Sequence, residues 1–252
     1  MTQTAAIWAE IAAAGPWALA ACGAAAFIGT LMQRLAGQGF GMITAPIVAI
    51  AAPEFLPATL LLLGAAIGLS STAVDLSEID RRELPAGFAG RALGAVIAAI
   101  IAAQLTNPDA FAALVAVMIY LGIALSLVGI RAAIRPVSLF LAGTLAGIMG
   151  TLTAVGAPPM ALLYQYEQQK RAAAMQNAFF LWGMLVSIGA LWIAGLVGWC
   201  HVGFAVFLAP MVIIGLVVAQ PLSRRVAKAQ MRPWALGLAG LAATGIVGKL
   251  IF

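Results

Sequence analysis

Charge is what this sequence has least of. Of its 252 residues, 13 are Lys or Arg, 8 are Asp or Glu and one is His, so charged side chains make up 8 % of the chain. Soluble globular domains carry about 25 % charged residues. Hydrophobic residues make up 64 %, and the mean hydropathy is +1.08. This composition excludes a soluble fold and indicates an all-α integral membrane protein, in which residues 1–252 form a single transmembrane domain.

Several functional groups are also missing. Cys22 and Cys200 are too few for a disulfide framework, and no CxxC pair occurs. Cys200 and the adjacent His201 would make a poor metal site by themselves. No Walker motif is present, which excludes ATP-driven transport by this chain alone, and no Asp or Glu lies deep in a predicted span, which argues against a carboxylate proton relay. We therefore expect no enzymatic activity, no metal and no cofactor.

Apolar runs instead predict ten helical segments. A helix needs about 20 apolar residues to cross a bilayer, and two segments, 41–52 and 158–168, are too short. Each follows a Gly/Thr-rich break, so each is expected to form a broken or re-entrant hairpin with the helix before it. The first fifteen residues are expected to be an interfacial segment or the start of the first helix. The ten segments are 16–35, 41–52, 57–74, 86–104, 109–130, 137–151, 158–168, 174–198, 203–222 and 233–251.

The few charges are distributed unevenly between alternate loops. Membrane proteins concentrate Lys and Arg in cytoplasmic loops. The loops on the opposite side have no Lys or Arg, apart from Lys249 near the C-terminus. The charged loops are therefore predicted to be cytoplasmic and both termini outside, in the inner membrane of a bacterial cell. This placement accounts for the +5 net charge without a nucleic-acid partner. The basic residues of the charged loops are Arg81, Arg82, Arg131, Arg135, Lys170, Arg171, Arg224, Arg225, Lys228 and Arg232.

The chain also contains an internal repeat. The segment "FIGTLMQRLAGQGFGMITAP" and the segment "LAGTLAGIMGTLTAVGAPP" share Gly-Thr-Leu, continue into a Gly/Thr/Ala break and reach proline. The same order of short and long segments follows each of them, over about 16–130 and about 137–251. Five segments per half is an odd number, so the second half enters the membrane from the opposite side. The sequence therefore predicts two inverted-topology repeats, each opened by a broken hairpin.

The two breaks, at 37–46 and 151–159, are the candidate binding site. Short, Gly/Pro-interrupted segments at matching positions of two halves point to a substrate site at the midplane, and helix N-termini attract anions. Glycines there allow close backbone approach, or they only pack helices together. Hydroxyl and amide side chains add neutral donors. The expected substrate-binding residues are Gln38, Gly39, Gly41, Thr44, Thr151, Thr153, Gly156, Ala157 and Arg34.

Charged and polar residues within the spans have two interpretations each. Arg34 either contacts substrate, since intramembrane charges are commonly functional, or extends to the inner headgroups. Arg91, about one turn inside its helix, is expected to extend to the headgroups. Gln176 and Asn177 are expected to open the long helix after the second hairpin, as caps or interhelical contacts.

The motifs "GQGFGMITAP", "GTLAGIMGTLTAVGAPPMALL" and "APMVIIGLVVAQPLSRRVAKAQMRPWALGLAGL" resemble those of the TauE/SafE sulfite exporter family of membrane permeases. The resemblance runs the full length of the chain. It implies secondary transport of a small sulfur-containing anion such as sulfite, thiosulfate or an organosulfonate. The partners expected are that anion and the lipid bilayer, while a coupling proton or sodium ion and a homo-oligomer stay open. Two alternatives are an intramembrane thiol redox protein and a passive channel for small solutes.

Overall fold

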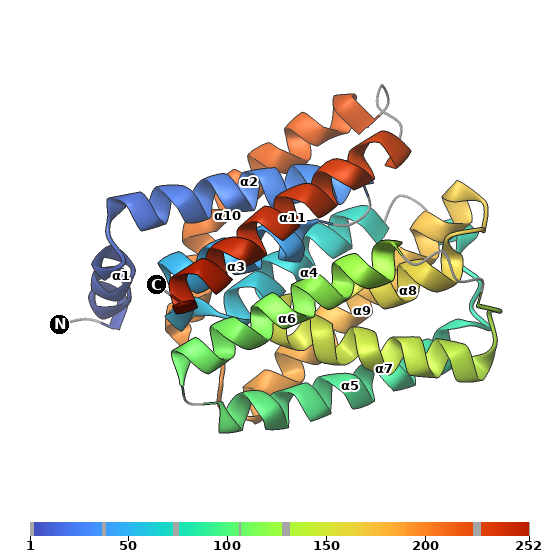
Figure 1. Cartoon of the computed structure of the whole chain (residues 1–252), viewed down its shortest axis with the longest axis horizontal. Helices are drawn as coiled ribbons and strands as arrows, with labels where there is room; N and C mark the ends of the chain where they lie inside the picture. Colours follow the sequence, from blue (N-terminus) through green and yellow to red (C-terminus); the bar gives the residue numbers. More distant parts are fainter. Residues whose placement is uncertain are drawn as a thin grey trace.

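The computed structural model describes residues 3–36, 39–72, 76–105, 107–127, 132–223 and 228–251. Within these ranges all of the regular secondary structure is helical, which confirms the predicted all-α class. The helices lie side by side in one elongated bundle (Figure 1). Four residues discussed above, Gln38, Arg131, Arg224 and Arg225, lie outside the described ranges.

Seven helices are long and apolar enough to cross a membrane, counted over the described residues. They come from the apolar runs that the sequence shows, and lipid-facing apolar side chains such as Leu141 and Leu241 remain exposed on them. In lipid such exposure costs nothing, because the surrounding tails are as apolar as the side chains. The seven are α2 (Pro16–Ala36), α5 (Leu84–Gln104), α6 (Pro108–Leu127), α7 (Pro136–Thr153), α9 (Gln169–Ile193), α10 (Trp199–Ser223) and α11 (Lys228–Ile251).

Three further helices of the bundle are too short to span. α3 (Phe40–Ala51) and α8 (Ala157–Tyr164) are the short helices that the sequence predicts after the two breaks. α4 (Ala58–Thr72) has 15 residues in the described part of the chain. The last two residues of the predicted segment 57–74 lie outside that part. α3 returns beside α2, and α8 lies next to α7, so each short helix forms a hairpin with the helix before it.

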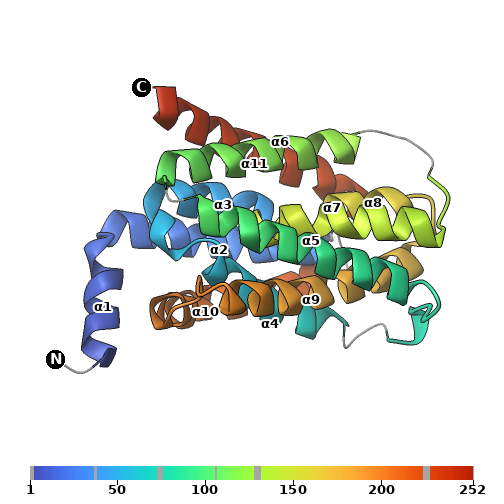
Figure 2. The same ribbon diagram turned by 90° about the horizontal axis from the view of Figure 1, so that it is seen from below.

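The N-terminal residues form a separate helix, α1 (Gln3–Ala13), which lies across the end of the bundle in both views (Figures 1 and 2). Most of its side chains are exposed, and Ile11 is buried. Ile7 packs over Gly203 of α10. These residues therefore form a helix of their own and not the start of α2.

Helix pairing is reciprocal between the two halves. α2 packs against α10, as α7 packs against α5, and α3 packs against α11, as α8 packs against α6. α4 contacts α9 directly, and α6 contacts α11. The two short helices are thereby placed in the middle of the bundle, each held against a long helix of the other half.

Several predicted boundaries are wrong. α8 ends at Tyr164 instead of 168 and α11 begins at Lys228 instead of 233, and two further differences affect residues discussed above. α9 begins at Gln169, five residues before the predicted start at 174 and directly after the turn that ends α8, so Gln176 and Asn177 lie inside a helix and do not cap it. α10 begins at Trp199, so Cys200 and His201 lie in its first turn and not in a loop. The His201 imidazole Nδ1 accepts a hydrogen bond from the Gly198 backbone N–H over 2.9 Å, which satisfies one end of the helix.

Candidate functional site

The two helix breaks meet inside the bundle. Gly41, in the first turn of α3, lies so close to the end of α7 that a Cβ atom added there would overlap the carbonyl group of Ala154. Ala154 itself has a left-handed backbone with φ 57° and ends α7. Only a residue without a side chain permits this approach at position 41. The predicted meeting of the two breaks is therefore present in the fold.

The start of α3 depends on a second glycine. Gly39 precedes the helix with φ 139°, a conformation that residues with a Cβ rarely adopt. The turn lets the Phe40 backbone N–H donate to Gln33 Oε1 of α2 over 3.3 Å, and it lets the Ile43 N–H donate to the Gly39 carbonyl over 2.9 Å. The amide of Gln33 thus serves one of the N–H groups left free at a helix start.

A small cavity of about 10 Å³ lies where the first turns of both short helices converge. That volume is about the room for one water molecule, so a sulfur oxyanion does not fit in this conformation. Residues from the first turn of α3 and from the end of α7 line this cavity together. Its lining residues are Gln33, Gly39, Gly41, Met42, Ala154, Val155, Ala157, Pro158 and Phe180.

The three threonines predicted as substrate-binding residues are completely buried at 0 % exposure, and each has a hydrogen-bond partner. Thr44 Oγ1 donates to the Ala25 carbonyl over 3.1 Å, and Thr153 Oγ1 donates to the Met149 carbonyl over 2.7 Å. The hydroxyl of Thr151 shares a hydrogen bond of 2.6 Å with that of Ser187. Thr44 thus joins α3 to α2 and Thr151 joins α7 to α9, whereas Thr153 bonds within α7. None of the three lines the cavity.

Arg34 is partly exposed in the last turn of α2. It is not among the residues lining the cavity, whereas its neighbour Gln33 is. The other predicted residues, Gly39, Gly41 and Ala157, do line the cavity, and Gly156 is the residue that caps α8. The structure therefore gathers the glycine part of the predicted set and leaves Arg34 beside it.

Arg91 is where the sequence-based prediction is wrong. Its side chain does not extend to the headgroups; it is 1 % exposed, in the interior of the bundle. The guanidinium Nη1 donates to the Ala146 carbonyl over 2.6 Å and to the Gly156 carbonyl over 3.2 Å. The position of Arg91 along its own helix predicts that the side chain can reach the headgroups. The glycines of α7 and α9 that make room for the side chain could be related to it only through the tertiary fold.

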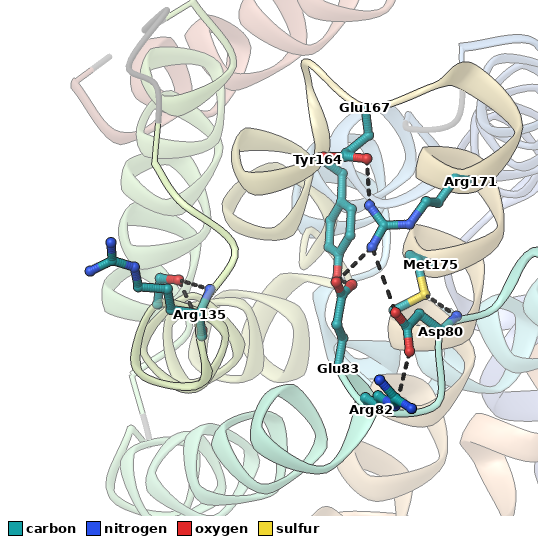
Figure 3. Close-up of polar contacts among 9 residues, drawn as sticks. Asp80, Arg82, Glu83, Arg135, Tyr164, Glu167, Arg171 and Met175 are labelled. Carbon is teal, nitrogen blue, oxygen red and sulfur yellow. Dashed lines mark hydrogen bonds and ion pairs between the residues drawn. The ribbon is translucent and has the colours of Figure 1, made fainter.

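A group of charged residues closes the end of the bundle where α8 and α9 join (Figure 3). Arg171 of α9 forms ion pairs with Glu167 and with Glu83, the latter at 2.6 Å. Asp80 lies 4.0 Å from the same guanidinium, and the Tyr164 hydroxyl donates to Glu83 over 2.7 Å. These contacts attach the loop before α5 to the turn after α8. The residues involved belong to, or lie next to, the charged loops that the sequence predicts on one side of the membrane.

Comparison with known proteins agrees with this architecture. The family model described as "Sulfite exporter TauE/SafE" matches residues 21–246, from α2 into α11. Neither the curated proteins nor the solved structures contain a match to the chain. The matched range includes both broken hairpins and the helices that enclose them. On this evidence the chain is a membrane protein that belongs to the sulfite exporter TauE/SafE family.

Proposed function

We propose that the protein is a secondary transporter that carries a small sulfur-containing anion, such as sulfite, thiosulfate or an organosulfonate, by alternating access. The observation that carries the proposal is the convergence of the first turns of α3 and α8 on one small cavity. Helix N-termini bear a partial positive charge and free N–H groups. Family membership supports the sulfur anion as the substrate class.

The reciprocal pairing of helices supports an inverted repeat as the basis of the mechanism. Because α2 meets α10 as α7 meets α5, one half can move against the other while an equivalent set of contacts is exchanged. The cavity at the two breaks would then open alternately to each side.

Transport in proteoliposomes tests the proposal. Vesicles containing the purified protein are loaded with sodium sulfite under anaerobic conditions. Sulfite efflux is compared with that from vesicles without the protein. We expect saturable, protein-dependent sulfite flux. A channel would give flux that rises linearly with concentration, and the absence of any sulfur-anion flux would contradict the proposal.

Two variants test the position of the site. Gly41→Val and Gly156→Val should abolish flux while the protein remains folded, because an added side chain at either position overlaps neighbouring atoms. Gly189→Val is the matched control, since a Cβ added at Gly189 meets nothing within 4 Å. Full activity of both site variants would contradict the assignment of the site to the helix breaks.

A further inference from the structure

Arg91 has donors that the fold leaves unused. Nη1 is occupied by the carbonyl oxygens of Ala146 and Gly156. Nε and Nη2 are completely buried, and neither has a hydrogen-bond partner in the described part of the chain. Buried polar groups nearly always have partners. Two unpaired N–H-bearing nitrogens on a buried cation indicate a ligand that is absent from this structure.

Three glycines make the space for this guanidinium. A Cβ atom added at Gly150 of α7 would lie 2.6 Å from Nη2. Added at Gly156, before α8, or at Gly183 of α9, it would overlap the guanidinium group. Side chains from three separate helical elements are thus missing at the one place where the guanidinium lies. The three glycines thus allow the charged Arg91 side chain to lie in the interior of the bundle. Charged side chains are rare within membrane-spanning helices.

No carboxylate neutralises Arg91 among the described residues, where the ion pairs all involve Arg171 at the end of the bundle. A charge removed from water is strongly disfavoured without a partner of opposite charge. An anion bound at Arg91 would supply both the opposite charge and the missing acceptors. Guanidinium groups suit oxyanions, because their planar N–H groups can donate to two oxygens at once.

The start of α8 offers fewer backbone donors than the start of α3, and Arg91 lies next to it although Arg91 does not itself line the cavity. The second and third residues of α8 are Pro158 and Pro159, and proline has no backbone N–H. Two of the donors that a helix start normally offers are therefore missing. α3 begins with Phe40, Gly41 and Met42, all of which carry N–H groups. The guanidinium adjoins Gly156, whose neighbours Val155 and Ala157 line the cavity.

We propose that Arg91 binds the transported anion directly, donating from Nε and Nη2, and that it determines the preference of the site for oxyanions over neutral molecules. This inference rests on the proposed function and assigns its charge-selective residue. In this structure the guanidinium fills the space beside Gly156, so the anion reaches Nε and Nη2 only when the breaks open. In this structure, Nη1 instead donates to the carbonyl oxygens of Ala146 in α7 and of Gly156.

The test measures binding of sodium sulfite by thermal unfolding of the detergent-purified protein, with sodium chloride at equal ionic strength as the reference. We expect sulfite to raise the unfolding temperature of the wild type and to drive flux in proteoliposomes. Arg91→Met removes the charge at similar volume and is expected to abolish both responses. Its unfolding temperature without sulfite should equal or exceed that of the wild type, because an unpaired buried charge has been removed.

Gly183→Ala gives a second test that keeps the charge. The new methyl group displaces the guanidinium from its cradle, and the apparent Kd for sulfite should rise at least tenfold. Gly189→Ala, on the same helix with open space around it, should leave that Kd unchanged. Should Arg91→Met fail to fold, the comparison of these two alanine variants decides the question.

The outcomes separate the two proposals. A wild type with neither a sulfite-dependent shift nor sulfite flux overturns the proposed function and the role of Arg91 together. A wild type that binds sulfite, with Arg91→Met or Gly183→Ala binding it equally well, overturns the role of Arg91 alone. Loss of unfolding temperature in Arg91→Met with an unchanged sulfite shift identifies Arg91 as a purely structural clamp and likewise overturns the inference.

Discussion

Gly41 of α3 and Ala154 of α7 are in direct backbone contact, with no room for a Cβ atom at position 41. This contact joins the opening hairpin of one half to the break of the other. It places the first turns of both short helices around one cavity. Under the proposed alternating access, we expect opening of the cavity to separate these two residues.

Gly41→Ala should therefore lower stability as well as transport. Overpacking of a tight contact costs about 1–3 kcal/mol, and the Ala154 carbonyl and the Val155 N–H belong to backbone that cannot rotate away. We expect a decrease of several degrees in the unfolding temperature, measured by differential scanning fluorimetry in detergent. Gly237→Ala is the control, since nothing lies within 4 Å of a Cβ at that position. Equal unfolding temperatures for the two variants would show that the contact opens freely.

The contact between α5 and α7 should be similarly intolerant. A Cβ atom added at Gly94 would overlap the Thr144 carbonyl, and one added at Gly90 would overlap that of Phe140. This close approach holds α5 where Arg91 reaches the Ala146 carbonyl. Gly94→Ala should lower the unfolding temperature by several degrees and weaken sulfite binding, if sulfite binds as proposed. Normal stability of this variant would mean that α5 can move away from α7 at little cost.

How far the sequence predicts this structure depends on the range of the interactions involved. The helices and the two breaks follow from apolar run length, glycine and proline, which act locally. Gly39 and Gly41 could be selected as site residues because a break in a membrane helix is itself a local signal. The contact of Gly41 with Ala154 requires only that the breaks occupy matching places in the two halves.

Arg91 shows what sequence patterns do not contain. Its burial depends on glycines at 150, 156 and 183, which lie 59 or more residues away along the chain. Those glycines look like ordinary helix-packing residues until α5, α7 and α9 are placed together. Thr44 and Thr151 illustrate the converse. Their hydroxyl groups match an anion site, but neighbouring helices supply hydrogen-bond partners for them at Ala25 and Ser187.

Arg171 links the loop before α5 to the turn after α8, through Glu83 and Glu167. Because the pairs are partly exposed, with 27 % of the Arg171 side chain accessible, the group is worth about 1 kcal/mol. Arg171→Gln should lower the unfolding temperature by a few degrees in low salt. The decrease should be smaller in 1 M NaCl, because the screening length of the salt is already about 10 Å at about a tenth of that concentration. Lys170→Gln, at the exposed neighbouring position, should have little effect. An equal loss at both salt concentrations would exclude an electrostatic origin.

A variant without cysteine tests the thiol redox alternative. Cys22 is buried in α2 and Cys200 lies in the first turn of α10, and both are free thiols. Cys22→Ser/Cys200→Ser should transport sulfite at the wild-type rate, because neither residue lines the cavity at the breaks. Flux in proteoliposomes prepared with and without dithiothreitol provides the measurement. Loss of flux on removal of both thiols, in a protein that still folds, would favour thiol chemistry.

The same cysteine-free protein allows the orientation in the membrane to be measured. Glu54, between α3 and α4, and Glu78, between α4 and α5, are exposed glutamates in short 3₁₀ helices. The turns between α3 and α4 and between α8 and α9 lie at opposite ends of the bundle (Figure 1). The excess of Lys and Arg predicts that Glu78 faces the cytoplasm and Glu54 the outside. In spheroplasts, a membrane-impermeant maleimide should label Glu54→Cys directly and Glu78→Cys only after the membrane is permeabilised. The reverse pattern would place both termini in the cytoplasm and would contradict the orientation, although the pairing of the helices would be unaffected.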